Sequence, residues 1–448
     1  MSKRNLVWLG VIAAIALGFY RLVLLASQQD SVYRTYAPLV EADALIRQKF
    51  VEPIEDDRLV EGAIRGMMLK LDPYSGYIGP EELTTFWRRA SGKYIGIGVH
   101  LGVRDGQLTV IAPIEQSPAV SAGVQAGDVI LAIDEVSSEG MGVADADHLL
   151  SGDPGSDVTL TVRHPRDGQV ESLRITRGPI NLWSVKGCRQ VGPRQWDYLI
   201  DPEAGIAYIR VSNFRDNTMT EFDRAVEQVR SLGAAGLIVD LRFNPGGSLK
   251  AAVAMVDRFV ESGLILSTVT RHKAKDIYKA KPEGTIPPLP MAVLINEGSA
   301  SASEIVAGSL QDHGRAVIVG TRSFGKGVVQ NVLELTEHRA AISLTVAHYR
   351  LPNGRVIHKT PRNSPTDEWG VLPDLVVEIP PEQELAIQER RRQVDRAPSV
   401  PATAPADEGG ETSSGGGPEI LIDDQLAAAL SELRARLEAS APSTLRDE

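Results

Sequence analysis

The chain has 448 residues, enough for about three domains of ordinary size, so it is neither a peptide nor a small disulfide-stapled module. Its 47 Lys and Arg residues stand against 58 Asp and Glu residues, which gives a formal charge of −11 and argues against a nucleic-acid partner. The single cysteine, Cys188, cannot form an internal disulfide, and the eight histidines are not set at zinc-ligand spacing. We therefore expect no metal and no cofactor.

The N-terminus has the pattern of an export signal. Lys3 and Arg4 precede an apolar run over Leu6–Ala26 that only Arg21 interrupts, and no A-x-A cleavage site follows. This predicts a membrane anchor or signal segment at residues 1–30 that holds the rest of the chain on the periplasmic or outer side of the inner membrane. The alternative is a buried N-terminal helix of a soluble protein.

Hydrophobic periodicity predicts an α+β multidomain protein. Its parts are an N-terminal helical domain at residues 31–90, a β-rich domain at 91–178, an α/β domain at 179–380, and a linker with a C-terminal helix at 381–448. Amphipathic helices are expected at Thr220–Leu232, Leu249–Val260 and Ser303–Asp312, and a final helix at Asp424–Leu437. Ala397–Pro418 is rich in Pro, Gly, Ser and Thr, which indicates a flexible linker.

The β-rich domain begins with the closely spaced glycines of Gly96-Ile97-Gly98-Val99. Backbone N–H groups of such a stretch can form a cradle for the carboxylate of a peptide C-terminus. With Ser117-Pro118-Ala119, the stretch Ala122–Ile130 and a helix over Ala144–Leu150, this segment resembles a PDZ domain. The alternative is a generic β-domain whose glycines only make turns.

Ser301 lies between an apolar strand, Met291–Ile295, and an amphipathic helix. A nucleophile at such a turn has an exposed hydroxyl, and the first N–H groups of the helix point at the oxyanion that its attack creates. However, Ser301-Ala302-Ser303-Glu304 also fits the S-x-x-E capping box, so Ser301 could simply cap the helix. The local sequence leaves both interpretations open.

A second motif, Gly320–Gln330, contains Lys326. A lysine can take the serine proton only when neutral, so its pKa of about 10.4 must fall, which burial achieves. A period of two places Lys326, Val328 and Gln330 on one face of the following strand, so that the Gln330 amide can hold the lysine nitrogen. The alternatives are a surface lysine or a phosphate loop, although Gly327 replaces the hydroxyl residue that a phosphate loop needs.

A third motif is the run Val239–Gly247, a strand that ends in a glycine turn. Glycines let the backbone approach a ligand closely and direct N–H groups at it. An ordinary turn at the end of a strand is the alternative.

Together the three motifs and the PDZ-like segment resemble the C-terminal processing peptidases, also called tail-specific proteases, over about Val32 to Val377. The resemblance implies a serine endopeptidase that cleaves proteins or peptides near their free C-termini, after the tail is bound at Gly96–Val99. The site residues that it implies are Ser301 as nucleophile, Lys326 as general base, Gln330 as the group orienting the lysine, and the N–H groups of Ala302 and of a glycine in the turn, with Gly246 as first choice, as oxyanion donors.

Two rival interpretations remain. The first is a histidine-dependent hydrolase using Ser301 with His313 and Asp312, or with the more distant His348 or His358. The second is a catalytically inactive, membrane-tethered scaffold that binds peptides through the PDZ-like segment alone. The sequence leaves open whether the protein is a homo-oligomer and whether the PDZ-like segment gates the site or only tethers the substrate.

Overall fold

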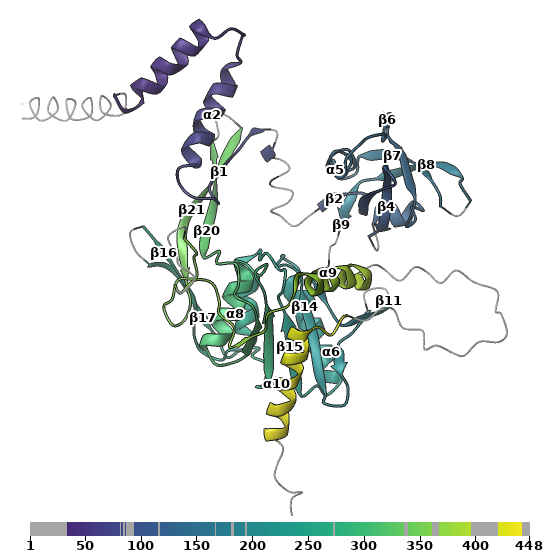
Figure 1. Ribbon diagram of the computed structural model, residues 1–448, viewed down its shortest axis with the longest axis vertical. Coiled ribbons are helices and arrows are strands. Elements are labelled where there is room, and N and C mark those ends of the chain that lie inside the picture. The colour runs from purple at the N-terminus through teal and green to yellow at the C-terminus, as the bar shows by residue number, and fades with distance from the viewer. Residues whose placement is uncertain are drawn as a thin grey trace, which may run out of the picture. The chain divides into compact units, whose positions relative to one another are not determined.

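A computed structural model describes most of the chain between residues 34 and 440 (Figure 1). The described residues are 34–80, 82–83, 86, 94–114, 117–165, 167–180, 183–192, 195–271, 274–335, 339–360, 367–395 and 420–440. Contacts divide them into two compact units, one containing the residues up to Gly79 with Glu334–Ser343, the other the rest. The expected anchor at 1–30 and the expected linker at Ala397–Pro418 lie outside the described residues, and within these ranges no helix is long and apolar enough to cross a membrane.

The first unit combines helices with a short strand. Its elements are a helical stretch at residues 34–49, α2 (Asp56–Met68) and β1 (Gly76–Ile78). Asp72 makes the turn between helix and strand, because its Oδ1 accepts the backbone N–H groups of Tyr74 and Ser75, each at 2.8 Å. β1 then pairs antiparallel with the start of β21 (Ala340–Arg350). The periodicity predicts only helix here, and a three-residue strand is too short to show alternation.

The β-rich domain is a sheet of order β3-β4-β5-β7-β8, with β6 paired to β5 and β2 paired to β9. Its strands are β2 (Tyr94–Gly96), β3 (Val99–Arg104), β4 (Gln107–Pro113), β5 (Val129–Ile133), β6 (Val136–Ser137), β7 (Asp157–Arg163), β8 (Val170–Thr176) and β9 (Gly178–Ile180). Two helices, α4 (Pro118–Ser121) and α5 (Val143–Leu150), complete it. Alternate residues of β7 point inward, and Leu160 packs in one core with Ala146 and Leu150 of α5.

The α/β domain is built on a seven-stranded sheet (Figure 1). Its strands are β10 (Val185–Lys186), β13 (Leu199–Asp201), β14 (Ile206–Val211), β15 (Gly236–Asp240), β18 (Met291–Ile295), β19 (Val317–Gly320) and β22 (Leu375–Val376). The last five run parallel in the order β14-β15-β18-β19-β22, and β10 and β13 are antiparallel to β14. A separate hairpin joins β11 (Arg189–Gly192) to β12 (Gln195–Asp197).

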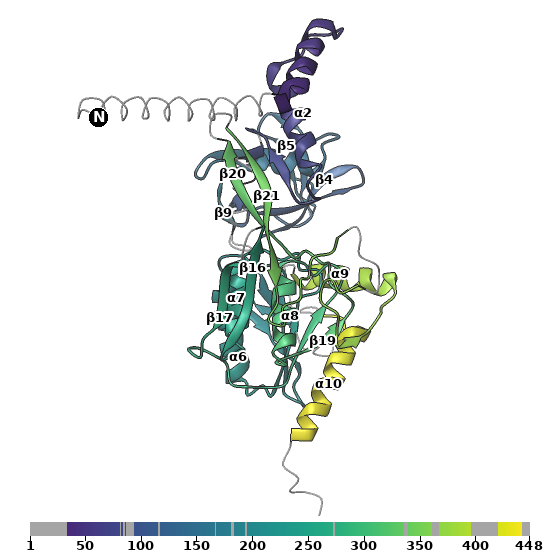
Figure 2. The ribbon, with the colours of Figure 1, turned by 90° about the vertical axis from the view of Figure 1, so that its left-hand side faces the viewer.

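Both faces of this sheet are buried, as is usual for parallel strands. One face packs against α6 (Thr218–Ser231), α7 (Leu249–Asp257) and α8 (Ala302–Asp312). The other packs against α10 (Asp424–Ser440), which lies beside β19 (Figure 2). Leu426 and Leu430 of α10 belong to one buried cluster with Ile238 and Leu294. Successive side chains of β14 point to opposite faces of the sheet. Ile209 packs in the cluster with α6, α7 and α8, and Tyr208 packs in the cluster with α10.

A second sheet has the order β1-β21-β16-β17, with β20 paired to β21. Its remaining strands are β16 (Gly263–Thr270), β17 (Ala274–Ala280) and β20 (Val328–Leu335). β20 begins two residues after Lys326, so its first residues belong to the predicted motif Gly320–Gln330.

The α+β multidomain prediction is confirmed, and the four predicted helices of the α/β domain and C-terminus are present with their ends shifted by at most three residues. The sequence prediction misses α9 (Pro381–Asp395). Its buried positions are Ile387, Arg391 and Val394, which share one face but include a charged residue. A hydrophobic pattern with arginine in its centre does not indicate a buried helix face.

His164 links three elements inside the β-rich domain. Its Nδ1 lies 2.8 Å from the buried Asp128 carboxylate and its Nε2 lies 3.2 Å from Glu171. Two carboxylates can both be satisfied only if both ring nitrogens carry hydrogen, so the hydrogen bonds to Asp128 and Glu171 raise the pKa of His164.

We predict that the β-rich domain is more stable at pH 6 than at pH 8. Because the pKa of His164 is higher in the folded than in the unfolded domain, protonation of His164 stabilises the folded state. This stabilisation is complete below the unfolded pKa of about 6.5 and is lost as the pH rises through the folded pKa. Thermal unfolding between pH 5.5 and 8.5 should show a decrease on the order of a few °C that His164→Gln abolishes. His148→Gln, at an exposed position, is the control. Identical pH dependence in wild type and His164→Gln would refute the prediction.

Candidate active site

Three loops follow the carboxyl ends of adjacent parallel strands, the edge at which open α/β sheets bind ligands. β15 ends at Asp240, β18 at Ile295 and β19 at Gly320. The loops after them contain, in the same order, Gly246, Ser301 and Lys326. The fold therefore brings the three sequence motifs to one edge of the sheet.

Ser301 occupies a strained turn between β18 and α8. Its φ of 55° and ψ of −111° lie in a region that non-glycine residues rarely adopt. The side chain stands at the N-terminus of α8, whose first residue is Ala302. Of the two interpretations of this serine, the helix cap is present in part, because the Ser301 N–H donates to Glu304 Oε2 at 2.8 Å. The same glutamate, however, does more than cap the helix.

Glu304 is fully buried and its carboxylate accepts four hydrogen bonds. Oε2 accepts the backbone N–H groups of Ser301 and Lys326, each at 2.8 Å. Oε1 accepts the Gly325 N–H and the Ser323 hydroxyl, each at 2.6 Å. Burial raises the pKa of Glu304, and the four donors oppose that rise. One carboxylate thus fixes the backbone at both the predicted nucleophile and the predicted base.

Lys326 lies in the loop before β20 and not on the strand itself, which starts at Val328. The period-of-two argument therefore applies to Val328 and Gln330 but not to Lys326, whose backbone is held by Glu304 instead. The Lys326 side chain is half-buried, and burial lowers its pKa while the nearby Glu304 carboxylate opposes the change. Gln330 is the third residue of β20, and its orienting role stays a prediction.

Gly246 lies directly against the start of α8. A Cβ at this position would be 2.6 Å from Ala300 O, 2.9 Å from Ala302 N and 2.9 Å from Ser301 Cβ. Among the described residues the Ala302 N–H has no acceptor, as expected at a helix N-terminus. The Gly246 N–H, in contrast, donates to Asn244 Oδ1 at 2.9 Å. Gly246 therefore keeps space open in front of the Ala302 N–H, and its own N–H is engaged in this conformation.

Tyr349 is a site residue to which the sequence reasoning gave no role. Its side chain is buried and interacts electrostatically with the Ser301 side chain. Burial raises its pKa to about 12, so its hydroxyl is protonated at physiological pH. Its backbone N–H donates to Gly327 O at 2.9 Å, next to Lys326. The family resemblance includes the stretch around Tyr349, but the neighbouring sequence gives no sign that this side chain meets Ser301.

The predicted carboxylate cradle is an ordered loop of the β-rich domain. Gly96, Ile97 and Gly98 are buried, and Val99 begins β3. Ile97 O accepts the Ala119 N–H at 2.8 Å, and Gly98 O accepts the Ser117 hydroxyl at 3.0 Å. Gly98 has a φ of 79°, and a Cβ there would lie 2.3 Å from Ser117 Cβ. Both the backbone conformation and the lack of space for a side chain therefore require glycine at position 98.

The alternative that uses His313 with Asp312 is not supported by the geometry. His313 follows the last residue of α8, about 18 Å from Ser301 at roughly 1.5 Å per helical residue, and its Nε2 contacts Leu264 O at 2.7 Å. Asp312 binds Asn353 instead of His313. Within the described ranges, no three His, Cys, Asp or Glu side chains are grouped so that they could hold a metal ion.

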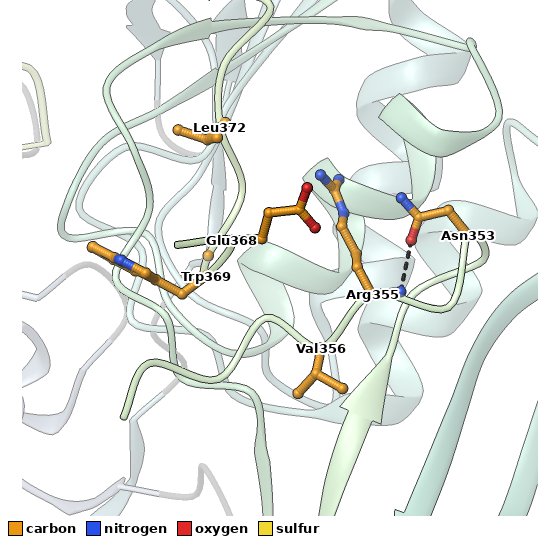
Figure 3. Close-up of a pocket in the computed structure, with 7 residues that line it drawn as sticks. Asn353, Arg355, Val356, Glu368, Trp369 and Leu372 are labelled. Carbon is orange, nitrogen blue, oxygen red and sulfur yellow. Dashed lines mark hydrogen bonds between the residues drawn. The ribbon is translucent and has the colours of Figure 1, made fainter. Parts of the chain in front are cut away.

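A small pocket of about 110 Å³ opens on the α/β domain (Figure 3). Its lining residues are Asn353, Arg355, Val356, Glu368, Trp369, Gly370 and Leu372. Asn353 and Arg355 bind Asp312 and Gln311, at the end of α8 opposite Ser301. The pocket is smaller than the roughly 300 Å³ at which ligand sites begin, so it is not the candidate active site.

Three family models match consecutive parts of the chain. The model of peptidase family S41 matches residues 205–377, that of a PDZ domain matches residues 109–164, and that of the activating protease CtpB N-terminal domain matches residues 24–82. The first match contains the loops with Gly246, Ser301 and Lys326. Helices α9 and α10 lie beyond it.

Similar proteins match most of the chain. The carboxy-terminal-processing protease of Bartonella bacilliformis is 35% identical over 360 residues, 79% of this chain and 77% of that protein. The carboxyl-terminal-processing protease of Picosynechococcus is 35% identical over 339 residues, 74% of this chain and 77% of that protein. CtpA, the carboxy-terminal processing protease of Bacillus subtilis, is 32% identical over 357 residues, 79% of this chain and 71% of that protein. The chain therefore belongs to peptidase family S41 and is a serine-type C-terminal processing protease with a PDZ domain.

Proposed function

We propose that this protease is an endopeptidase that uses a Ser301/Lys326 dyad, with Gln330 orienting the lysine. The observation that carries the proposal is the buried Glu304 carboxylate, which binds the backbone N–H groups of both Ser301 and Lys326. A shared acceptor fixes the separation of the two backbones, and a fixed separation is what direct proton transfer between their side chains requires.

The chemistry follows from the protonation state of the lysine. Neutral Lys326 takes the proton of the Ser301 hydroxyl while Oγ bonds to the scissile carbonyl carbon, and the partial burial that lowers the Lys326 pKa supports this role. The negative oxygen of the tetrahedral intermediate accepts the Ala302 N–H at the start of α8, in the space that Gly246 leaves open. The lysine ammonium then protonates the leaving amine, and neutral Lys326 activates the water that releases the acyl group.

Single substitutions test the dyad. Ser301→Ala and Lys326→Ala should each lower kcat by at least about 10³-fold, and the double variant should lose no more than either single one, because both groups act in one proton transfer. Steady-state hydrolysis of a labelled peptide measures this, with thermal unfolding as the check on folding. Lys281→Ala, which removes an exposed lysine, should leave kcat unchanged. Cleavage by Lys326→Ala at near wild-type rate would assign the base to another group.

We further propose that the PDZ domain selects substrates by their C-terminal tail. The ordered loop at Gly96–Gly98 and the strand β3 that follows it support a mode in which the tail adds to β3 and its carboxylate meets backbone N–H groups. Binding of the tail raises the local concentration of the cleavage site near Ser301.

A pair of glycine variants tests tail recognition. Gly98→Ala should raise KM for a tailed substrate by about 10-fold or more and leave hydrolysis of an amidated, untailed reporter unchanged, because the new Cβ meets Ser117 at 2.3 Å. Gly106→Ala has a similar φ of 74° but open space around its Cβ, so it controls for backbone strain. An equal loss on both substrates would assign Gly98 to the stability of the domain instead.

A further inference from the structure

The peptide bond between Arg242 and Phe243 is held from both sides by distant side chains. It precedes the turn that contains Gly246, and Phe243 has a φ of 63°, which is strained for a residue with a side chain. Its N–H, on Phe243, donates to Asn296 Oδ1 at 2.8 Å. Its carbonyl, on Arg242, accepts from Arg391 Nη1 at 2.9 Å. The orientation of this peptide plane therefore depends on two side chains outside the turn.

The two side chains come from different parts of the fold. Asn296 directly follows β18 in the loop of Ser301, so its bond ties the glycine turn to the nucleophile loop. Arg391 belongs to α9, beyond the segment that matches the S41 family model. Its guanidinium also donates to Asp240 Oδ2 and lies 5.1 Å from the centroid of the Phe243 ring. The Arg391 guanidinium thus contacts Asp240 at the end of β15, the carbonyl of Arg242 and the aromatic ring of Phe243.

The contact is embedded in a buried, charge-balanced group. Asp240 and Asp423 face Arg242 and Arg391, and all four are at most 8% exposed. Arg242 binds Asp240 at 2.8 Å and Asp423 at 2.7 Å. Burial alone would raise the pKa of Asp240, but the two arginines lower it well below its usual range, so the carboxylate stays charged. Removing either cation leaves charge uncompensated at the base of the turn.

We propose that Arg391 is a positioning residue for catalysis, which holds the Arg242–Phe243 peptide plane and with it the turn that borders the oxyanion space. The inference rests on the proposed function of this edge of the sheet. Gly246 is four residues beyond Arg242 and lies against Ala302 N and Ser301 Cβ, so a rotation of the preceding peptide plane moves the wall of the space in which the oxyanion forms. A group that acts there stabilises the transition state more than the bound substrate.

Three variants of α9 test the proposal in the full-length protein. Arg391→Gln removes the charge, Arg391→Lys keeps it but lacks the planar fork that reaches Asp240 and Arg242 O together, and Arg392→Gln changes a neighbour whose ion pair with Glu389 is exposed. We expect kcat for an untailed reporter to fall by about 100-fold in Arg391→Gln and by about 10-fold in Arg391→Lys, with KM within about threefold of wild type. Arg392→Gln should stay within about twofold.

A peptide aldehyde supplies the readout that a purely structural role would not change. Ser301 Oγ adds to the aldehyde carbon and the proton ends on the new oxygen or on the base, so the adduct resembles the tetrahedral intermediate. Its inhibition constant should rise in the Arg391 variants by a factor similar to the loss in kcat, while KM stays nearly constant. Thermal unfolding identifies the temperature range in which each variant is folded, and all rates are measured below it.

Several results would overturn the proposal. A lower melting temperature of Arg391→Gln with kcat within twofold of wild type would make Arg391 a stabilising residue only, and so would equal losses in Arg391→Gln and Arg392→Gln. If Arg391→Gln does not fold, Arg391→Lys decides by the same criteria. Failure of the Lys326 assignment is separable, because it appears as activity in Lys326→Ala and leaves the aldehyde measurement on Arg391 intact.

Discussion

The site depends on one buried carboxylate. Glu304 projects from the first turn of α8 and receives the N–H groups of Ser301 on its own helix and of Lys326 on the loop after β19. A carboxylate removed from water is unfavourable unless donors surround it, and the four hydrogen bonds meet this requirement only when both loops are in place. The same interaction that makes the buried charge tolerable therefore brings the two proposed catalytic residues to a fixed separation.

The parallel sheet supplies the frame around this carboxylate. Strands β15, β18 and β19 are nearly fully apolar on both faces and end at one edge, where the backbone changes from ladder hydrogen bonds to loops. Helix α10 packs on one face of the sheet, and Arg391 of α9 and Asp423, the residue before α10, reach the same edge. The C-terminal part of the chain is thus tied to the active-site turns by buried charges as well as by packing.

Much of this arrangement could be predicted from the sequence, because apolar runs, glycine turns and amphipathic helices are local signals. The helices that border the sheet and the edge position of Ser301 follow from them. The rest depends on contacts between distant segments. The spacing Ser301-x-x-Glu304 indicates one hydrogen bond of Glu304 but not the other three, and Tyr349 approaches Ser301 only after β21 has paired. Arg391 breaks the apolar pattern of α9 because its charged partner, Asp240, lies at the end of the distant strand β15.

The most direct test of the account is kcat of Glu304→Gln. The amide has the same shape but only one accepting oxygen, so two of the four donors lose their acceptor and Ser301 and Lys326 are no longer held by one group. We predict a loss of at least about 100-fold in kcat with a folded protein and little change in KM, whereas Glu297→Gln, an exposed change in the same loop, stays near wild type. A folded Glu304→Gln variant with kcat within twofold of wild type would contradict the account.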